Sequence, residues 1–284
     1  MRRLIINADG LGFSPGVNRG IRETAAFGLV KSTSALVNFE AAEEIPQFAR
    51  DFPMVSIGIH LNLTVGRPVA EPSRVRSLID PQSGEFYGNR LPFLLMSGRV
   101  KWNEICLELE SQVKKMIDFG IQITHVDGHQ NKHLYPPLFF AVLETAKKYG
   151  IKRIRSHRRF LTGSPRQKLN YYVAHPQRLA THMAGRVLTD YARVKGLRCA
   201  DRLISPGYAD SSRKYLLSSW MELAKILPSG TSEIYCHPAY PDDILRRYAT
   251  YVEERRIEVE VLTSEELRAS FAMANIEIIS FYDL

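Results

Sequence analysis

The sequence predicts a single-domain α/β fold with mostly parallel strands, either a barrel or a doubly wound sheet. Short β-rich runs alternate with longer helical patterns along most of the chain, which is typical of parallel strands joined by right-handed crossovers. The length of 284 residues fits two average domains or one α/β barrel. Because neither an internal repeat nor a low-complexity linker divides the chain, residues 1–284 are predicted to form one domain.

The first half of the chain begins with a buried strand and a capped helix. Residues 3–9, with the apolar run 4–6, predict the strand, whereas Ser14 as N-cap and Pro15 at the first helical position begin a helix over residues 15–29. The next elements are strands at 32–38 and 55–61 and a helix at 41–51. The loop at 66–90 is too long for a plain connection, so it is expected to be functional.

The second half continues the alternation. Apolar side chains three and four residues apart predict a helix over residues 103–119. Further strands are predicted at 121–127, 151–156, 203–205, 232–236, 259–262 and 276–280. Further helices are predicted at 137–149, at 213–227, from 242 through the 250s, and from a cap at Thr263 or Ser264 to about residue 271.

The composition excludes several classes of protein. Hydrophobic residues make up 45%, charged residues 24% and aromatic residues 10%, which excludes disordered, collagen-like and disulfide-scaffold proteins. The cysteines, Cys106, Cys199 and Cys236, are odd in number and form no CxxC pair, which favours a reducing compartment over a structural zinc knuckle. The sequence contains neither a signal-peptide core nor 18 uninterrupted apolar residues, so a cytoplasmic location is expected.

The net charge of +8 is concentrated in residues 152–198. This segment has twelve Lys and Arg residues and one acid, Asp190, a net +11 that leaves −3 for the remainder. A basic helical insertion of one or two helices is predicted at about 157–200. Its apolar residues at near-helical spacing are Leu169, Tyr172, Val173, Leu179, Met183, Val187, Tyr191 and Val194.

Two interpretations of this basic segment stay open. The first is a helix that packs on the core and has a solvated basic face. The second is a patch that contacts an anionic membrane surface or a glycolipid. Because no nucleic-acid-binding motif accompanies the charge, nucleic acid is not expected as a partner.

Polar side chains follow several of the predicted strands, where sites form in parallel α/β folds. They are Asn7, Asp9, His60, Asn62, His125, Asp127, His129, His237 and Tyr240. A single histidine in such a place is more often structural, and Asp9 before Gly10 suits a turn. Because four strands deliver imidazoles or carboxylates to one rim, we expect a site there.

These residue types suit a divalent metal that keeps an open coordination position. Such a metal activates water and polarises a carbonyl group, while a separate aspartate acts as base and a histidine as acid. This equipment would hydrolyse an amide or an ester. The sequence has no GxGxxG motif, Walker lysine or GxSxG motif. A metal-free glycoside hydrolase using Asp9 and Asp127 would leave the histidines unexplained.

Several motifs occur in an order that resembles the YdjC/ChbG family of carbohydrate deacetylases. They are NADGLG at 7–12, STSALVN at 32–38, GIHLNLTVGRP at 58–68, THVDGHQNKH at 124–133, EIYCHPAY at 233–240, and EVLTSEEL with the closing IEIISFYDL. The resemblance covers nearly the whole chain. It implies a distorted (β/α) barrel that hydrolyses N-acetyl groups of sugars with a divalent metal, Mg or Zn.

The resemblance also implies roles for individual residues. Asp9 matches the general base, and His237 matches the general acid. His60 and His129 match the metal ligands, with His133 as the runner-up, but Gly10 stands where the family has a metal-binding aspartate. The residues expected to contact substrate or to orient the ligands are Asn7, Asn62, His125, Asp127, Arg155 and Tyr240.

The predicted function is therefore metal-dependent removal of an N-acetyl group from an amino sugar, either an oligosaccharide or a glycolipid. The DGHQ sequence with Gln130 is similar to hopanoid-associated members of the family, which suggests an N-acetylglucosaminyl hopanoid. The alternative is a catalytically silent sugar- or glycolipid-binding homologue, because of Gly10. Peripheral contact with the inner membrane and a homodimer stay open.

Overall fold

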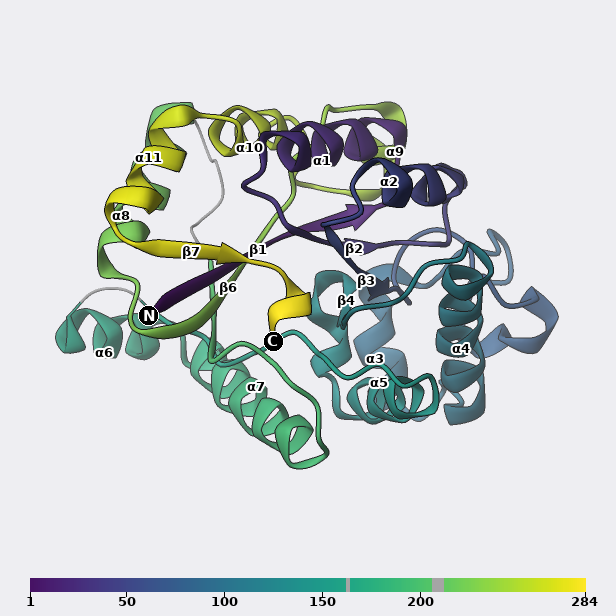
Figure 1. The fold of residues 1–284 in the computed structure, drawn as a ribbon. Helices are drawn as coiled ribbons and strands as arrows, with labels where there is room; N and C mark the ends of the chain where they lie inside the picture. Colours follow the sequence, from purple (N-terminus) through teal and green to yellow (C-terminus); the bar gives the residue numbers. More distant parts are fainter. Residues whose placement is uncertain (162–163, 206–211) are drawn as a thin grey trace.

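The computed structural model describes residues 1–161, 164–205 and 212–284. Their strands form one parallel sheet in the order β4-β3-β2-β1-β6-β5. The remaining strand, β7, pairs with the first residues of β1, before those that pair with β2 (Figure 1). The strands are β1 (Arg2–Leu11), β2 (Ser32–Ala35), β3 (Ser56–Leu61), β4 (Val126–Gly128), β5 (Arg202–Ile204), β6 (Gly230–Cys236) and β7 (Ile276–Ile279). The long strand β1 is therefore the central element of the fold.

The two faces of β1 have different partners. Leu4, Ile6 and Ala8 belong to the main hydrophobic core, whereas Ile5 belongs to a separate small cluster with the C-terminal residues. Because successive side chains of a strand point to opposite faces, Asn7 and Asp9 lie on the same inner face as Ile5. The alternation thus brings a buried carboxylate to the carboxyl end of the central strand.

Backbone hydrogen bonds of residues 152–160 connect the two edges of the sheet. Val126 N–H donates to the Arg153 carbonyl at 3.0 Å on the β4 side. On the other side, Ile154 N–H donates to the Arg198 carbonyl at 2.9 Å, and Leu203 N–H of β5 donates to the Arg158 carbonyl at 2.9 Å. The sheet is therefore curved and irregularly bridged, and the predicted distorted barrel is confirmed.

Helices surround the sheet, with α1, α8, α10 and α11 grouped on one side and α4 and α5 on another (Figure 1). The helices are α1 (Pro15–Phe27), α2 (Ile45–Asp51), α3 (Leu91–Met96), α4 (Trp102–Asp118), α5 (Pro136–Lys148), α6 (Pro165–Ala174), α7 (Pro176–Val194), α8 (Arg213–Ile226), α9 (Asp243–Tyr248), α10 (Arg255–Leu262) and α11 (Glu265–Met273). As predicted, Ser14 caps α1, where its side chain accepts from Val17 N–H. None of the helices in the described residues is long and apolar enough to cross a membrane.

Several predicted elements differ from the structure. The strand predicted at 259–262 is wrong, because these residues form the end of α10, where Val259 and Val261 are buried and Glu260 is exposed. The β propensity of the valines is outweighed by packing of this helix against α1 and α8. The helix predicted from residue 242 ends at Tyr248, and the predicted strand at 121–127 pairs regularly only from Val126.

The basic segment forms two helices, α6 and α7, which lie at the lower left of Figure 1. On α7 the buried residues are Gly185, Thr189 and Ala192. The larger apolar side chains Leu169, Val173, Met183, Val187 and Val194 are instead 61% to 83% exposed. The interpretation that these side chains pack on the core is therefore wrong, because the small residues of α7 form its inner face. Its status as an insertion stays a prediction.

The C-terminal residues close the lower end of the barrel. Phe281 is buried with Ile5 and Ile279, and its ring stacks on His125 with 3.6 Å between the ring centroids. Its backbone N–H lies 3.2 Å from the hydroxyl oxygens of Ser32 and Ser56, which accept the hydrogen bond. The last residues therefore form the floor beneath the polar side chains of the rim.

We expect Phe281→Ala to lower the free energy of unfolding by about 3–5 kcal/mol, because it leaves a cavity under the sheet. The control is Tyr282→Ala, since Tyr282 is 44% exposed and its removal should cost less than about 1 kcal/mol. Urea unfolding followed by circular dichroism measures both. Equal losses for the two variants would contradict the assignment of Phe281 as the floor.

Candidate active site

A single guanidinium joins the carboxylates at the rim of the barrel. Arg155 binds Asp9 with two hydrogen bonds, Nη1 to Oδ2 at 2.7 Å and Nη2 to Oδ1 at 2.6 Å. Its Nη2 also lies 2.8 Å from Oδ2 of Asp127, and its Nε donates to Oε1 of Glu233 at 2.6 Å. All four side chains are buried, so Arg155 links β1, β4 and β6 inside the barrel.

The electrostatic balance keeps most of this group ionised. Burial alone would raise the pKa of Asp9 and of Asp127, but the neighbouring Arg155 outweighs it and both pKa values are lowered. Burial alone would lower the pKa of Arg155, but the carboxylates raise it well above its usual value. Glu233 is the exception, because burial raises its pKa to about 7 in spite of Arg155.

Asp127 orients the first histidine. Nδ1 of His60 donates to Oδ1 of Asp127 at 2.7 Å, and the hydroxyl of Ser34 donates to Oδ2 of Asp127 at 3.0 Å. Because Nδ1 carries the proton in this hydrogen bond, the lone pair of His60 lies on Nε2. Burial lowers and Asp127 raises the pKa of His60, with a net increase.

The second histidine follows β4 on a sharp turn. Gln130 and Asn131 both have φ of 54°, a left-handed conformation that turns the chain directly after His129. Nδ1 of His129 lies 3.4 Å from Nε2 of His60. Burial and the nearby His60 lower the pKa of His129 well below its usual value, so its imidazole is neutral.

These side chains face a cavity of about 540 Å³. Its lining includes Asp9, Gly10, His60, His129 and His237 together with Tyr235, Tyr248, Tyr251, Glu254 and Arg255. His237 directly follows β6, and its backbone N–H donates to Oε2 of Glu258 at 2.5 Å. Burial and Arg255 lower the pKa of His237 to about 3, which keeps this ring neutral.

The donor set fits a divalent cation in part. Two nitrogens about 2.1 Å from one ion at a tetrahedral angle lie about 3.4 Å apart, which is the separation of His60 Nε2 and His129 Nδ1. Asp9, His60 and Asp127 also form a compact buried group, with one ligand atom of each within 4.8 Å of the others. Asp9 and Asp127 stay ionised beside one guanidinium, which leaves excess negative charge and favours a cation nearby.

Gly10 stands where the resemblance in the motifs predicts a metal-binding aspartate. A side chain there would meet its nearest atoms only at 3.8 Å or beyond, so the position has space. The φ of Gly10 is 103°, however, a conformation that residues with a Cβ rarely adopt. A carboxylate at this position would therefore fit the space but strain the backbone.

The structure brings only some of the predicted residues to the cavity. Asn7 donates to Oδ1 of Asp9 at 2.8 Å, and Asp127 and Arg155 lie behind the lining residues. His133 instead forms a hydrogen bond with His157, with 2.7 Å between their Nε2 atoms. It therefore faces away from His60.

Three other predicted residues lie outside the cavity lining. His125 packs between Phe281 and Gly58, where a Cβ would come within 2.4 Å of its ring. The side chain of Asn62 accepts from Thr64 N–H and Val65 N–H and so shapes the following loop. The hydroxyl of Tyr240 donates to Glu23 at 2.7 Å on the outer side of α1.

Sequence reasoning missed Glu233, Ser34 and the wall formed by Tyr251 and Arg255. A signal for Glu233 was present, since it is the one acid within the apolar strand 232–236. The signal for Ser34 was weaker, because serine is common in strands of many kinds. The wall comes from the turn before α10 and from the first residue of that helix, and its approach to the cavity depends on tertiary packing.

The raised pKa of Glu233 predicts a pH-dependent effect of Glu233→Gln. The folded pKa of about 7 exceeds the ordinary value of 4.5, so the protonated carboxyl stabilises the fold at low pH and this contribution is lost as pH rises through 7. Glutamine does not titrate. Between pH 5 and 8 the stability of the variant relative to the parent should therefore rise by up to about 3 kcal/mol. Urea unfolding at both pH values measures it.

The exposed Glu265 provides a matched control, since Glu265→Gln removes the same charge at the surface. Its stability relative to the parent should stay nearly constant between pH 5 and 8. A constant difference for Glu233→Gln as well would show that Glu233 stays ionised throughout this range.

Comparisons with known proteins agree over nearly the whole chain. Residues 3–273 match the family model described as YdjC-like protein. A carbohydrate deacetylase of Listeria monocytogenes is 33% identical over 283 residues, covering 99% of this chain and 100% of the relative. A carbohydrate deacetylase of Thermoanaerobacter pseudethanolicus is 31% identical over 267 residues, covering 94% of this chain and 93% of the relative.

A solved structure from Enterococcus faecalis, of a protein whose name proposes cellobiose-phosphate cleavage, has a TM-score of 0.77 and 27% identity. It covers 99% of this chain and 98% of its own. The resemblance seen in the motifs is thus confirmed by the family model and by whole-chain similarity. The chain belongs to the YdjC-like protein family.

Proposed function

We propose that the protein is a metal-dependent carbohydrate deacetylase that hydrolyses the N-acetyl group of an amino sugar. The observation that carries the proposal is the juxtaposition of His60 and His129 with Asp9 at the floor of one cavity. The relatives named carbohydrate deacetylase, which match nearly the whole chain, support the same activity. The cavity of about 540 Å³ is within the usual range for a small-molecule site.

His60 and His129 would hold the cation, with Asp9 as the nearest carboxylate in the lining. A divalent cation, when bound, acts as a Lewis acid on the acetyl carbonyl and lowers the pKa of water. Asp127 fixes the orientation of the His60 ring through its Nδ1–H. Mg and Zn are the candidates, and the two imidazole ligands favour Zn.

Asp9 acts as the general base. Arg155 and Asn7 hold its carboxylate in one orientation, and Arg155 keeps it ionised and able to accept the proton of the attacking water. The same guanidinium lowers the basicity of Asp9. Asp9 therefore contributes to the reaction through its fixed position and its negative charge, and not through a high proton affinity. After the attack, the proton resides on Asp9 next to the substrate.

His237 protonates the departing amine. Its ring lines the cavity and is neutral in the resting protein. Negative charge that develops on the substrate raises the pKa of this imidazole and so opposes the effect of burial. The histidine can then take up a proton from water in the cavity and transfer it to the leaving nitrogen, and Asp9 returns its own proton to water, which balances the two transfers.

The substrate is an acetylated amino sugar, as an oligosaccharide or as a glycolipid such as an N-acetylglucosaminyl hopanoid. The aromatic rings of Phe13, Tyr248 and Tyr251 in the lining suit the apolar face of a sugar ring. Contact of the 152–198 segment with a membrane surface, peripheral association with the inner membrane and a homodimer stay predictions. The cytoplasmic location stays a prediction as well.

The alternative is a sugar-binding homologue that keeps the cavity without turnover. The observation that favours it is Gly10, since the imidazoles of His60 and His129 then face the cation site without the family's aspartate beside them. Metal content and acetate release distinguish the two functions.

We expect the unaltered chain to retain a divalent metal and to release acetate from N-acetylglucosamine oligosaccharides. Gly10→Asp should bind the metal about tenfold more tightly or better, because it adds an anionic ligand. Gly10→Asn is the matched control, since it has the same size and backbone strain but no charge. The measurements are metal analysis after dialysis and acetate release with added zinc, magnesium, manganese or cobalt.

Metal and acetate release found only in Gly10→Asp would establish the silent homologue. The absence of metal from all three proteins would contradict a metallohydrolase of any kind.

Asp9→Asn should reduce turnover by about 10²–10⁴-fold, because the amide cannot accept the proton. Sugar binding, measured by calorimetry, should be retained, since asparagine keeps the shape of the side chain. The control is Asp243→Asn, which removes an exposed carboxylate of α9. Unchanged turnover in Asp9→Asn would rule out its role as base.

A further inference from the structure

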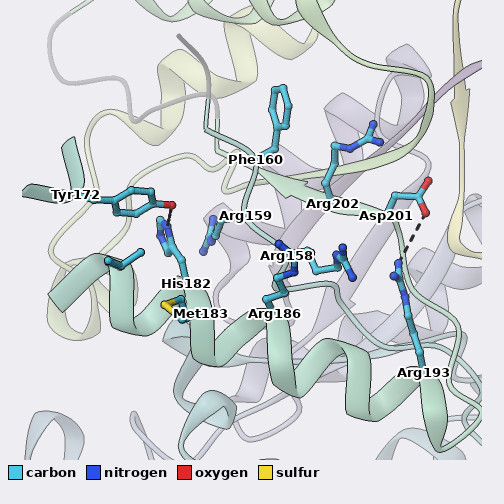
Figure 2. Close-up of a pocket in the computed structure, with 11 residues that line it drawn as sticks. Arg158, Arg159, Phe160, Tyr172, His182, Met183, Arg186, Arg193, Asp201 and Arg202 are labelled. Carbon is cyan, nitrogen blue, oxygen red and sulfur yellow. Dashed lines mark hydrogen bonds and ion pairs between the residues drawn. The ribbon is translucent and has the colours of Figure 1, made fainter. Parts of the chain in front are cut away.

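A second cavity, of about 570 Å³, lies between helix α7, residues 158–160 and the start of β5. Figure 2 shows the side chains of Arg158, Arg159 and Arg186 gathered above α7. Five arginines line this cavity together with one carboxylate, that of Asp201. Its lining shares no residue with that of the catalytic cavity.

The ion pairs of the described residues leave part of this positive charge uncompensated. Asp190 pairs with Arg158 at 2.5 Å and with Arg193 at 3.8 Å, and Asp201 pairs with Arg193 at 3.8 Å. Arg159 and Arg186 have no ion pair with any carboxylate of the described chain. Arg159 is half-buried, whereas Arg186 is exposed on α7. A half-buried guanidinium without an anion is costly, so Arg159 in particular favours an anionic occupant of the cavity.

Arg159 is held in place by the side chain of Tyr235. Its guanidinium carbon lies 5.4 Å from the ring centroid of Tyr235, and its Nη1 donates to the Tyr235 hydroxyl at 3.4 Å. Tyr235 also lines the catalytic cavity, so the contact of Arg159 with Tyr235 joins a lining residue of each cavity. Stacking on an aromatic ring leaves the other N–H groups of the guanidinium available to a ligand.

A polar pair without charge completes the lining. The Tyr172 hydroxyl and Nδ1 of His182 form a hydrogen bond of 3.1 Å (Figure 2). The arginines come from three separate elements, namely the chain after residue 157, helix α7 and strand β5. Donors that approach from several directions match a tetrahedral oxyanion better than a planar carboxylate.

We infer that this arginine-lined cavity is a binding site for a phosphoryl group, separate from the catalytic cavity. The ligand is held by hydrogen bonds from Arg159 and Arg186, with Arg158 and Arg202 nearby. The group can belong to a free phosphate, to a soluble phosphate monoester or to a phospholipid headgroup. Leu179 and Met183, both partly exposed, form an apolar part of the lining that suits the last of these.

The test is calorimetric titration of the full-length protein with inorganic phosphate at constant ionic strength. We expect saturable binding, and we expect the double variant Arg159→Gln with Arg186→Gln to raise the Kd about tenfold or more. The matched control is Arg50→Gln with Arg256→Gln, which removes the same charge from exposed residues of α2 and α10. The control should keep the parent's Kd within about twofold.

Equal weakening in the two double variants would overturn the inference, because it would show attraction by net charge alone. The absence of saturable phosphate binding to the parent protein would overturn it as well. Circular dichroism of each variant establishes that the comparison is between folded proteins.

Two further arms distinguish the sources of the phosphoryl group. A soluble hexose phosphate that competes with inorganic phosphate supports a small-molecule ligand. Binding to vesicles that contain phosphatidylglycerol, but not to vesicles of phosphatidylcholine alone, supports a lipid headgroup under two conditions. Inorganic phosphate must displace the protein from the vesicles, and the Arg159→Gln, Arg186→Gln variant must not bind them. Vesicle binding that phosphate does not displace would overturn the inference, since the cavity would then be uninvolved.

Discussion

The interaction on which the rest of the site depends is the contact of Arg155 with three buried carboxylates. Asp9 belongs to β1, Asp127 to β4 and Glu233 to β6, so this one guanidinium connects three strands of the sheet. Without its charge, the ionised carboxylates of Asp9 and Asp127 would remain inside the barrel, with His60 beside Asp127 as the nearest compensation. The position of Asp9, and through Asp127 that of His60, therefore follows from a single cation.

This arrangement also decides where the negative charge of the site lies. The carboxylates of Asp127 and Glu233 are one layer below the cavity, and only Asp9 among the three reaches the lining. The imidazoles of His60 and His129 face the cavity as neutral or proton-sharing groups. An aspartate at position 10 would add a negative charge at the cavity itself. With glycine there, a cation in the cavity is attracted mainly by carboxylates that lie farther away.

The sequence was sufficient for the parts of the fold that depend on local rules. Continuous apolar residues predicted β1, the Ser14 cap predicted α1, and strand ends predicted that Asp9, His60 and His129 meet at one rim. It was insufficient where packing decides. Val259 and Val261 have the composition of a strand but are buried in a helix, because α10 packs on α1 and α8.

The same limit applies to the side chains beyond the strand ends. Asn62 and Tyr240 follow strands closely, but the chain has already turned there, so the two-residue alternation no longer sets their direction. The ion pair of Arg155 with Glu233 joins residues 78 positions apart. Each of the two can be recognised in the sequence as a charged residue among apolar ones. That they pair with each other depends on the curvature of the sheet.

The position of β7 has a consequence for synthesis. Its pairing with β1 and the seat of Phe281 under the sheet join the last residues of the chain to the first strand. A nascent chain emerging from the ribosome can assemble β1, β2 and β3 early, but the floor stays open until residues 276–284 have been synthesised. Chaperones that shield apolar surface would therefore meet an unsealed barrel until then, and the pairing of β7 with β1 acts as its closing step.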